Sequence, residues 1–401
     1  MPASLRVLAV LLMAALILPA RVVPAHTAAP VLIGFDGAYG VLNSTSAQAI
    51  ERGIQVALDE INAGGGVLGG RPMTLVTRDN RSVPARGVFN IREFARTPDL
   101  VAVVGGRFSP VQLQELPVIH ETGIILLDAW GSADGITAHG YRPSDTFRLS
   151  LRDSIGMPVM IEHAKRKGAQ TIGLLLPNTG WGRSNLQAAV RYAAGVDRPE
   201  LLEPQWYNWG EQDMLRHYRA LTVAGADAII LVANDIEGGL LVRQLGAVDP
   251  GEWVPIISHW GVTGGHMVEE SGPTLFALDF SMVQTFSLFR AEPEMRDRVM
   301  AVAQRLFGIG RIEDIASPVG FGQAYDLTHL LARAIDRAGT TDRAAVRDAL
   351  EQLRDYRGLT GNYPRPFSPE RHDALGQEQV FMARYRKDGV IVPSEEHGGS
   401  P

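Results

Sequence analysis

The apolar positions between residues 50 and 61 recur at the spacing of one helical face. Ile50, Ile54 and Ile61 fall on that face, while Glu51 and Asp59 fall on the opposite one. The pattern therefore predicts an amphipathic helix. Glycines from position 64 onward end it, because glycine accepts the left-handed backbone of a helix C-terminus, and residues 72–76 are then predicted as a strand.

Short apolar runs without alternation are interleaved with helical patterns along most of the chain. Such runs are typical of strands covered on both faces. Strands are expected at 31–35, 72–76, 101–104, 124–127, 171–176, 201–207, 228–232 and 254–257, and further helices at 87–96, 111–121, 157–167, 184–194, 214–224 and 238–245. Alternation of strand and helix implies parallel sheets, and a break after Arg148 divides the series. The predicted fold class is α/β, with two doubly wound parallel-sheet lobes.

The last third of the chain has a more mixed pattern. An extended segment at 277–286 is expected to carry the chain between domains. Helices are predicted at 293–306, 322–338 and 342–353, the last with Thr341 as its cap. Residues 379–385 and 390–393 are predicted to pair as a hairpin.

The N-terminal residues have the pattern of a secretory signal peptide. Arg6 precedes an apolar run over 7–18, and Pro19 and small residues follow. The run is too short for a spanning helix, which needs about 20 apolar residues. We therefore assign residues 1–25 to a signal peptide and expect a soluble, exported, periplasmic protein.

Composition removes several classes of function. The chain of 401 residues has a net charge of -6 and no Lys/Arg cluster, which argues against nucleic acid as a partner. It has no cysteine, and so no disulfide, thiolate ligand or catalytic thiol. Gly64, Gly66 and Gly69 fit GxGxxG, but a helix precedes them and a strand follows. That order is the reverse of a dinucleotide site, so a long turn is the preferred interpretation.

Three of the loops that follow predicted strands contain Trp-Gly, at Trp130, Trp181 and Trp260. In open parallel sheets, ligands bind outside the carboxyl ends of the strands, and tryptophan stacks well on flat or apolar ligand surface. Packing in the core or between domains is the alternative for each tryptophan alone. Their shared position favours a ligand site. Trp209 is a weaker candidate, whereas Trp206 and Trp253 are interpreted as packing residues.

Enzyme motifs are poorly represented. The sequence has no GxSxG, HExxH or Walker motif, and its histidines are scattered without metal-site spacing. Asp36 and Asp128 could form a carboxylate pair, but no nucleophile or base accompanies them, and turn formation is the simpler explanation. We predict no catalytic residues, no metal and no cofactor.

Several motifs in order resemble one family. The run LDEINAGGGVLGGRPMTLVTRDN at 58–80 resembles the "DEINAxGGVLG" segment of periplasmic solute-binding proteins of the branched-chain amino acid (Leu/Ile/Val-binding) family. Further similar stretches lie at 103–109, 123–141, 178–182, 226–228, 322–326 and 359–361. The resemblance spans roughly 31–392 and implies the type I periplasmic binding fold of ABC importers.

The resemblance also implies a division of the chain and roles for particular residues. Three hinge crossings would join lobe 1 (31–148 and 283–360) to lobe 2 (149–282 and 361–392), with a tail at 393–401. Ser109 and Ser132 match the positions that grip a ligand carboxylate. Trp181 stands where an aromatic residue covers the ligand.

Departures from the family pattern change the expected ligand. Trp260 stands at the position of the acidic residue that holds an amino acid's ammonium, Asn234 replaces an aromatic residue, and Trp130 replaces a small one. Because a buried ammonium without a carboxylate is costly, an ordinary amino acid fits only if Asp128 or Asp235 takes that role. An aromatic acid, an amide or another compact amphiphile suits the tryptophans better.

The sequence thus predicts a monomeric binding protein that encloses a small solute between two lobes and delivers it to an inner-membrane ABC permease. The expected ligand-binding residues are Phe108, Ser109, Trp130, Ser132, Trp181, Asn234 and Trp260, with Asp36 and Asp128 as polar accessories. A sensory binding protein for a membrane receptor is the alternative, and a cleft enzyme such as an amide hydrolase is a more distant one.

Overall fold

The first lobe is built on a five-stranded sheet in the order β2-β1-β3-β4-β5, with every neighbouring pair parallel. This computed structural model describes residues 29–40 and 45–394. The strands are β1 (Val31–Gly37), β2 (Met73–Asp79), β3 (Leu100–Gly105), β4 (Ile125–Asp128) and β5 (Thr146–Arg148). All six residues of β3 are buried, as expected for an unalternating apolar run covered on both faces.

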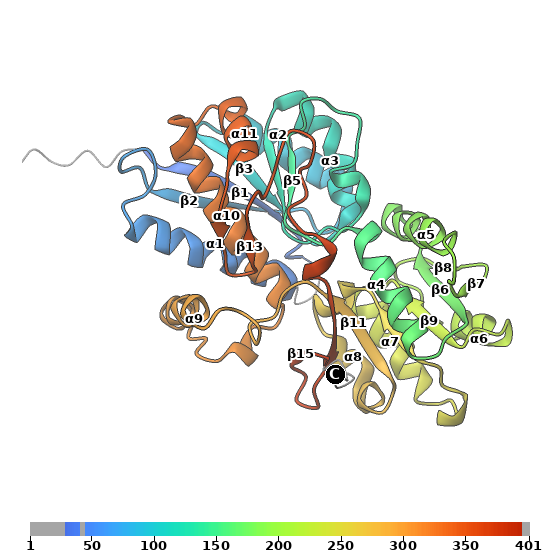
Figure 1. Cartoon of the computed structure of the whole chain (residues 1–401). Helices are drawn as coiled ribbons and strands as arrows, with labels where there is room; N and C mark the ends of the chain where they lie inside the picture. The colour runs from blue at the N-terminus through green and yellow to red at the C-terminus, as the bar shows by residue number, and fades with distance from the viewer. Residues whose placement is uncertain (1–28, 41–44, 395–401) are drawn as a thin grey trace, which may run out of the picture.

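Helices cover both faces of this sheet. One face packs against α2 and α3, and the other against α1, α10 and α11 (Figure 1). The bounds are α1 (Thr45–Ala63), α2 (Pro84–Arg96), α3 (Ser109–Thr122), α9 (Pro293–Phe307), α10 (Pro318–Ala338) and α11 (Arg343–Gln352). Helices α1 and α10 meet closely at Gly53, where a Cβ atom would lie 2.1 Å from the carbonyl oxygen of Phe321. The amphipathic face predicted for 50–61 is buried in this contact.

The second lobe has an eight-stranded mixed sheet. Its order is β15-β14-β11-β10-β9-β6-β7, with β8 also paired to β6; β14 pairs antiparallel with both β11 and β15, and the other pairs are parallel. The strands are β6 (Thr171–Pro177), β7 (Glu200–Leu201), β8 (Gln205–Tyr207), β9 (Ala228–Leu231), β10 (Ile256–Ser258), β11 (Phe280–Gln284), β14 (Phe381–Tyr385) and β15 (Ile391–Pro393).

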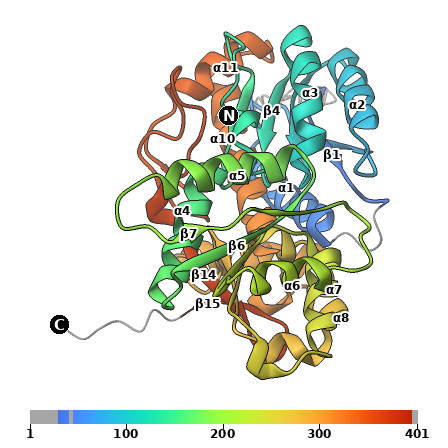
Figure 2. The same cartoon turned by 90° about the vertical axis from the view of Figure 1, so that its right-hand side faces the viewer.

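Helices of the second lobe again lie on both faces of its sheet (Figure 2). They are α4 (Asp153–Arg166), α5 (Gly180–Ala193), α6 (Leu215–Val223), α7 (Asp235–Leu245) and α8 (Met267–Ser271). Short 3-10 helices are η1 (Asp134–Ile136), η2 (Pro250–Glu252), η3 (Trp260–Thr263), η4 (Gly272–Phe276), η5 (Ile312–Asp314) and η6 (Gln377–Gln379), and a two-stranded hairpin joins β12 (Tyr356–Arg357) to β13 (Asn362–Tyr363). Within the described ranges, no helix is both long and apolar enough to cross a membrane.

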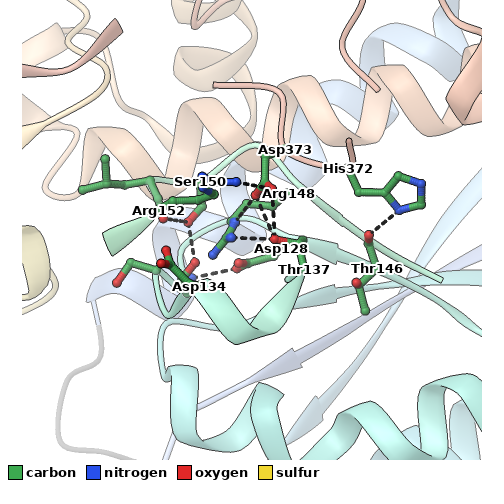
Figure 3. A network of polar contacts seen from close by, with 12 residues as sticks. Asp128, Asp134, Thr137, Thr146, Arg148, Ser150, Arg152, His372 and Asp373 are labelled. Atoms are coloured by element: carbon green, nitrogen blue, oxygen red, sulfur yellow. Dashed lines mark hydrogen bonds and ion pairs between the residues drawn. The ribbon is translucent and has the colours of Figure 1, made fainter. Parts of the chain in front are cut away.

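The chain passes between the lobes three times, at 149–152, 285–292 and 364–380. Charged side chains join two of these crossings (Figure 3). Arg148 Nε lies 2.6 Å from Asp373 Oδ1, and Arg152 Nη1 lies 3.2 Å from Asp373 Oδ2. Arg148 also donates to Thr137 Oγ1 and is fully buried. We call Arg148, Arg152, Thr137 and Asp373 the hinge clasp.

The predicted fold class is confirmed, with three local corrections. Segment 277–286 is not a linker, since β11 within it lies between β10 and β14 in the second sheet, and the crossing follows it. The strand predicted at 201–207 is interrupted and forms β7 and β8. The cap of α11 is Asp342, whose carboxylate accepts from Ala345 N–H, whereas the Thr341 hydroxyl donates to Asp99.

Some short elements were not predicted from the sequence, and two predictions stay predictions. Strand β5 and the β12–β13 hairpin are too short for a periodic signal. The lobe ranges remain a prediction; Phe367 packs against Phe147 of β5 before the chain enters the second lobe. The signal peptide lies outside the described residues.

Candidate ligand-binding cleft

A cavity lies between the two lobes. The loops after β3 and β4 line it from the first lobe, and the loops after β6, β8, β9 and β10 line it from the second. The carboxyl ends of both sheets therefore face one space, as the topology of parallel sheets leads one to expect. The lining residues are Arg107, Phe108, Ser109, Pro110, Trp130, Ser132, Trp181, Trp209, Asn234, Trp260 and Gly261.

The first lobe contributes a tightly bonded wall. Ser109 begins α3, and its Oγ accepts the N–H groups of Ser132 at 3.0 Å and Ala133 at 3.2 Å. Since both contacts use the oxygen as acceptor, the hydroxyl hydrogen is left to donate. Asp128 fixes the next loop, because its Oδ1 accepts from the backbone N–H groups of Trp130 at 3.1 Å and Gly131 at 2.7 Å. These bonds hold the backbone that carries the Trp130 ring.

The second lobe contributes two tryptophans and an amide. Trp181 lies in the first turn of α5, and its ring meets the buried His259 edge-on at 5.1 Å. Trp260 begins η3, and only glycine fits after it, since a Cβ at Gly261 would lie 2.4 Å from a carbonyl oxygen and 2.7 Å from the Trp181 ring. Asn234 is the N-cap residue of α7 but makes no side-chain capping bond. Its amide is thus available to a ligand.

Aromatic contacts close the cavity between the lobes. Trp130 and Trp260 have ring centroids 6.0 Å apart, and Phe108 meets Trp209 edge-on at 5.5 Å. In each pair one ring comes from each lobe. The arrangement is that of a closed cleft, since separating the lobes would break both contacts.

Hydrogen-bond donors without partners gather at the cavity. Among the described residues, the buried indole Nε1 atoms of Trp130, Trp181 and Trp209 have no hydrogen-bond partner, although buried tryptophan N–H groups usually find one. The N-termini of α3, α5 and α7 also begin at the cavity, and each carries a partial positive charge. Among the residues that the structure describes, no Asp or Glu lines the cavity. It therefore suits a molecule that brings acceptors or negative charge.

The cavity brings together seven of the nine residues singled out from the sequence, all except Asp36 and Asp128. Asp128 is fully buried under its own loop, and burial raises its pKa to about 6. Asp36 lines a separate space with Asn80 and Glu115. Burial raises the pKa of Glu115 well above its usual range, and the neighbouring Asp36 raises it further. The role of the seven in binding stays a prediction.

Sequence reasoning missed three lining residues, Arg107, Pro110 and Gly261, and ranked Trp209 low. Arg107 and Pro110 flank two predicted residues in the same loop, and Gly261 follows Trp260. Taking whole strand-end loops would have found them. Across the described ranges, no group of three His, Asp or Glu side chains could hold a metal ion.

Two α/β lobes with three crossings and a closed cavity between their strand ends define a two-lobed binding protein. Residues 30–389 match the family model described as "Periplasmic binding protein", and the chain belongs to this family. The resemblance inferred from the sequence motifs is confirmed.

Relatives and solved structures agree with this assignment. A Leu/Ile/Val-binding protein homolog 3 of Brucella melitensis is 23% identical over 75% of this chain and 77% of its own. The periplasmic binding protein type 1 of Bordetella pertussis superposes with a TM-score of 0.80 at 21% identity, covering 91% of this chain and 99% of that one. A solute binding protein of an ABC transporter from R. palustris, in complex with 4-hydroxybenzoate, gives 0.77 at 17% identity, covering 92% and 96%.

Proposed function

We propose that this protein is the periplasmic substrate-binding component of an ABC importer and that it encloses a small aromatic acid between its lobes. One observation carries the ligand class. The cavity combines four tryptophans, three of them with unpartnered indole N–H donors, and none of its described lining residues is acidic. Flat indole faces suit an aromatic ring, and donors at three helix N-termini suit a carboxylate.

An amino acid fits this cavity less well because its ammonium would have no counter-ion. Asp128 does not line the cavity, although its Oδ2 has no hydrogen-bond partner among the described residues, and Asp235 is paired with Arg107. A buried ammonium without a carboxylate costs several kcal/mol. The solved relative that holds 4-hydroxybenzoate supports an acid, whereas the Leu/Ile/Val-binding relative supports the alternative.

We propose transport rather than chemistry. The described lining residues include no nucleophile–base pair, which supports capture of the ligand without turnover. The signal peptide at 1–25 would export the chain to the periplasm, where the monomer would deliver its ligand to an inner-membrane permease. Contacts with both lobes would drive closure, because only the closed form makes both sets.

A thermal-shift screen of the mature protein, from Ala28 onward, tests the ligand class. The panel is benzoate, 4-hydroxybenzoate and benzamide against leucine, isoleucine and phenylalanine. A ligand at about a hundred times its Kd adds about 2.7 kcal/mol of stability. We expect stabilisation by the two acids and none by the amino acids. Stabilisation by leucine or isoleucine alone would refute the aromatic-acid assignment and require a carboxylate at the ammonium.

A further inference from the structure

A buried ion pair joins the two lobes at the edge of the cavity. Arg107 lies in the loop after β3, and Asp235 is the first residue of α7. Arg107 Nη1 lies 2.8 Å from Asp235 Oδ1, and the two side chains are only 6% and 5% exposed. An ion pair at this burial is strongly coupled, since loss of either partner strands the other charge away from water.

The second lobe forms a fitted socket for this arginine. The other oxygen of Asp235, Oδ2, accepts the backbone N–H of His266 at 3.1 Å. A Cβ at Gly264 would lie 2.0 Å from Arg107 Nη1, and one at Gly265 would lie 1.9 Å from Asp235 Oδ2. The backbone at 264–265 therefore passes directly over the pair, and no side chain could be accommodated there. Arg107 is held from several sides by the opposite lobe.

Arg107 also separates Asp235 from the ligand space. Arg107 lines the cavity and Asp235 does not. The guanidinium stacks on Phe108, with its carbon 4.6 Å from the ring centroid. Its buried Nε has no hydrogen-bond partner among the described residues. The Arg107 side chain thus presents positive charge at the cavity and at the same time forms an ion pair with the Asp235 carboxylate, which lies outside the cavity lining.

We propose that Arg107 and Asp235 form a charge latch that holds the lobes closed and decides the charge of the ligand. By occupying Asp235, Arg107 denies an ammonium group its counter-ion and leaves the closed cavity to anions. The part of this inference that concerns the charge of the ligand rests on the proposed function. The part that concerns closure of the lobes does not depend on any ligand.

The ligand arm compares wild type with Arg107→Met, Asp235→Asn and the double variant R107M/D235N. Its probes, 4-hydroxybenzoate and tyramine, share a phenol ring and carry opposite charges. By calorimetry, R107M should bind the acid about tenfold more weakly than wild type and should acquire tyramine binding, because the stranded carboxylate needs a cation. R107M/D235N, like wild type, should not bind tyramine. Absence of tyramine binding by R107M would overturn the charge assignment.

The latch arm measures closure without ligand. The chain has no cysteine, so Gln114→Cys and Ala220→Cys place two dyes at exposed positions on opposite lobes. Energy transfer should fall in R107M and stay at the wild-type value in Arg191→Met, a matched arginine whose interlobe pair is exposed. Equal transfer in R107M and wild type would overturn the latch. Failure of wild type to bind 4-hydroxybenzoate, with the latch arm intact, would count against the proposed function alone.

Discussion

The indole nitrogens of the cleft are the residue-scale feature that most constrains the ligand. Trp130 and Trp181 have exposed fractions of 1% and 6%, and their Nε1 atoms have no partner among the described residues. Leaving a buried donor unpaired costs about 1–3 kcal/mol. A ligand acceptor that pairs with them would recover that cost, so we expect each indole N–H to contribute to affinity.

Trp181→Phe tests this contribution because it keeps an aromatic ring and removes the N–H. We expect affinity for 4-hydroxybenzoate to fall about tenfold, equivalent to roughly 1.4 kcal/mol for one hydrogen bond. Isothermal calorimetry gives the value. The matched control is Trp253→Phe, whose indole already donates to the Leu245 carbonyl at 3.2 Å outside the cavity. A larger loss of affinity in the control would show that the donors do not set binding.

Asp128 makes stability depend on pH. Burial raises its pKa to about 6 from an ordinary 3.8, although Arg148 and several hydrogen bonds act in the opposite direction. The folded state holds this proton more tightly than the unfolded chain, so the contribution is present at low pH and is lost as pH rises from about 4 to about 6. A rise of about two pKa units corresponds to about 3 kcal/mol.

Asp128→Asn should remove that dependence. Relative to wild type, its free energy of unfolding should improve by about 3 kcal/mol between about pH 4 and about pH 7. Urea unfolding at several pH values provides the comparison. Asp249→Asn, at an exposed turn, serves as the control and should track wild type. A difference between D128N and wild type that is constant with pH would contradict the assignment.

Elements with a strong period could be predicted from sequence, and elements held by tertiary contacts could not. Helix α1 and strand β3 follow from local pattern alone. Strand β11 was taken as a linker because its pattern is indistinct, and its identity comes from pairing with β10 on one side and β14 on the other. Strand β5 has three residues and is fixed by β4 and by the hinge clasp.

The hinge clasp should carry a large share of stability at the crossings. Burial acts to raise the pKa of Asp373, but Arg148 and Arg152 hold it below its usual value, so the carboxylate is charged. Asp373→Ala strands the fully buried Arg148 and should cost about 3–5 kcal/mol of unfolding free energy.

Denaturant unfolding measures this cost. Arg148→Met combined with Asp373→Ala removes both charges and should be less destabilised than Asp373→Ala alone. Asp279→Ala breaks the exposed pair with Lys167 and should cost no more than about 1 kcal/mol. Equal costs for Asp373→Ala and Asp279→Ala would show that the clasp is dispensable.

At the scale of the whole molecule, the cavity is a product of closure. Strand-end reasoning located seven of its lining residues, because topology fixes where strands end. It could not assign Arg107 or exclude Asp36 and Asp128. Arg107 is placed by its contact with Asp235, 128 residues away, which no local period encodes, whereas Asp36 and Asp128 are bonded to groups of their own lobe.

The contacts that hold the two lobes together differ in how far they are buried. Arg107–Asp235 and Phe108–Trp209 are buried interlobe contacts, whereas the interlobe pair between Arg191 and Asp134 has side chains 60% and 22% exposed. An exposed pair contributes about 0–1 kcal/mol, and the 2.9 Å bond from Asp134 N–H to Ser184 Oγ does not need Arg191.

Arg191→Ala should therefore change affinity for 4-hydroxybenzoate by less than about fivefold. Its radius of gyration in small-angle X-ray scattering should equal that of wild type, both without and with ligand. A variant that binds but stays extended would place the closing contacts at this exposed rim rather than at the buried ones.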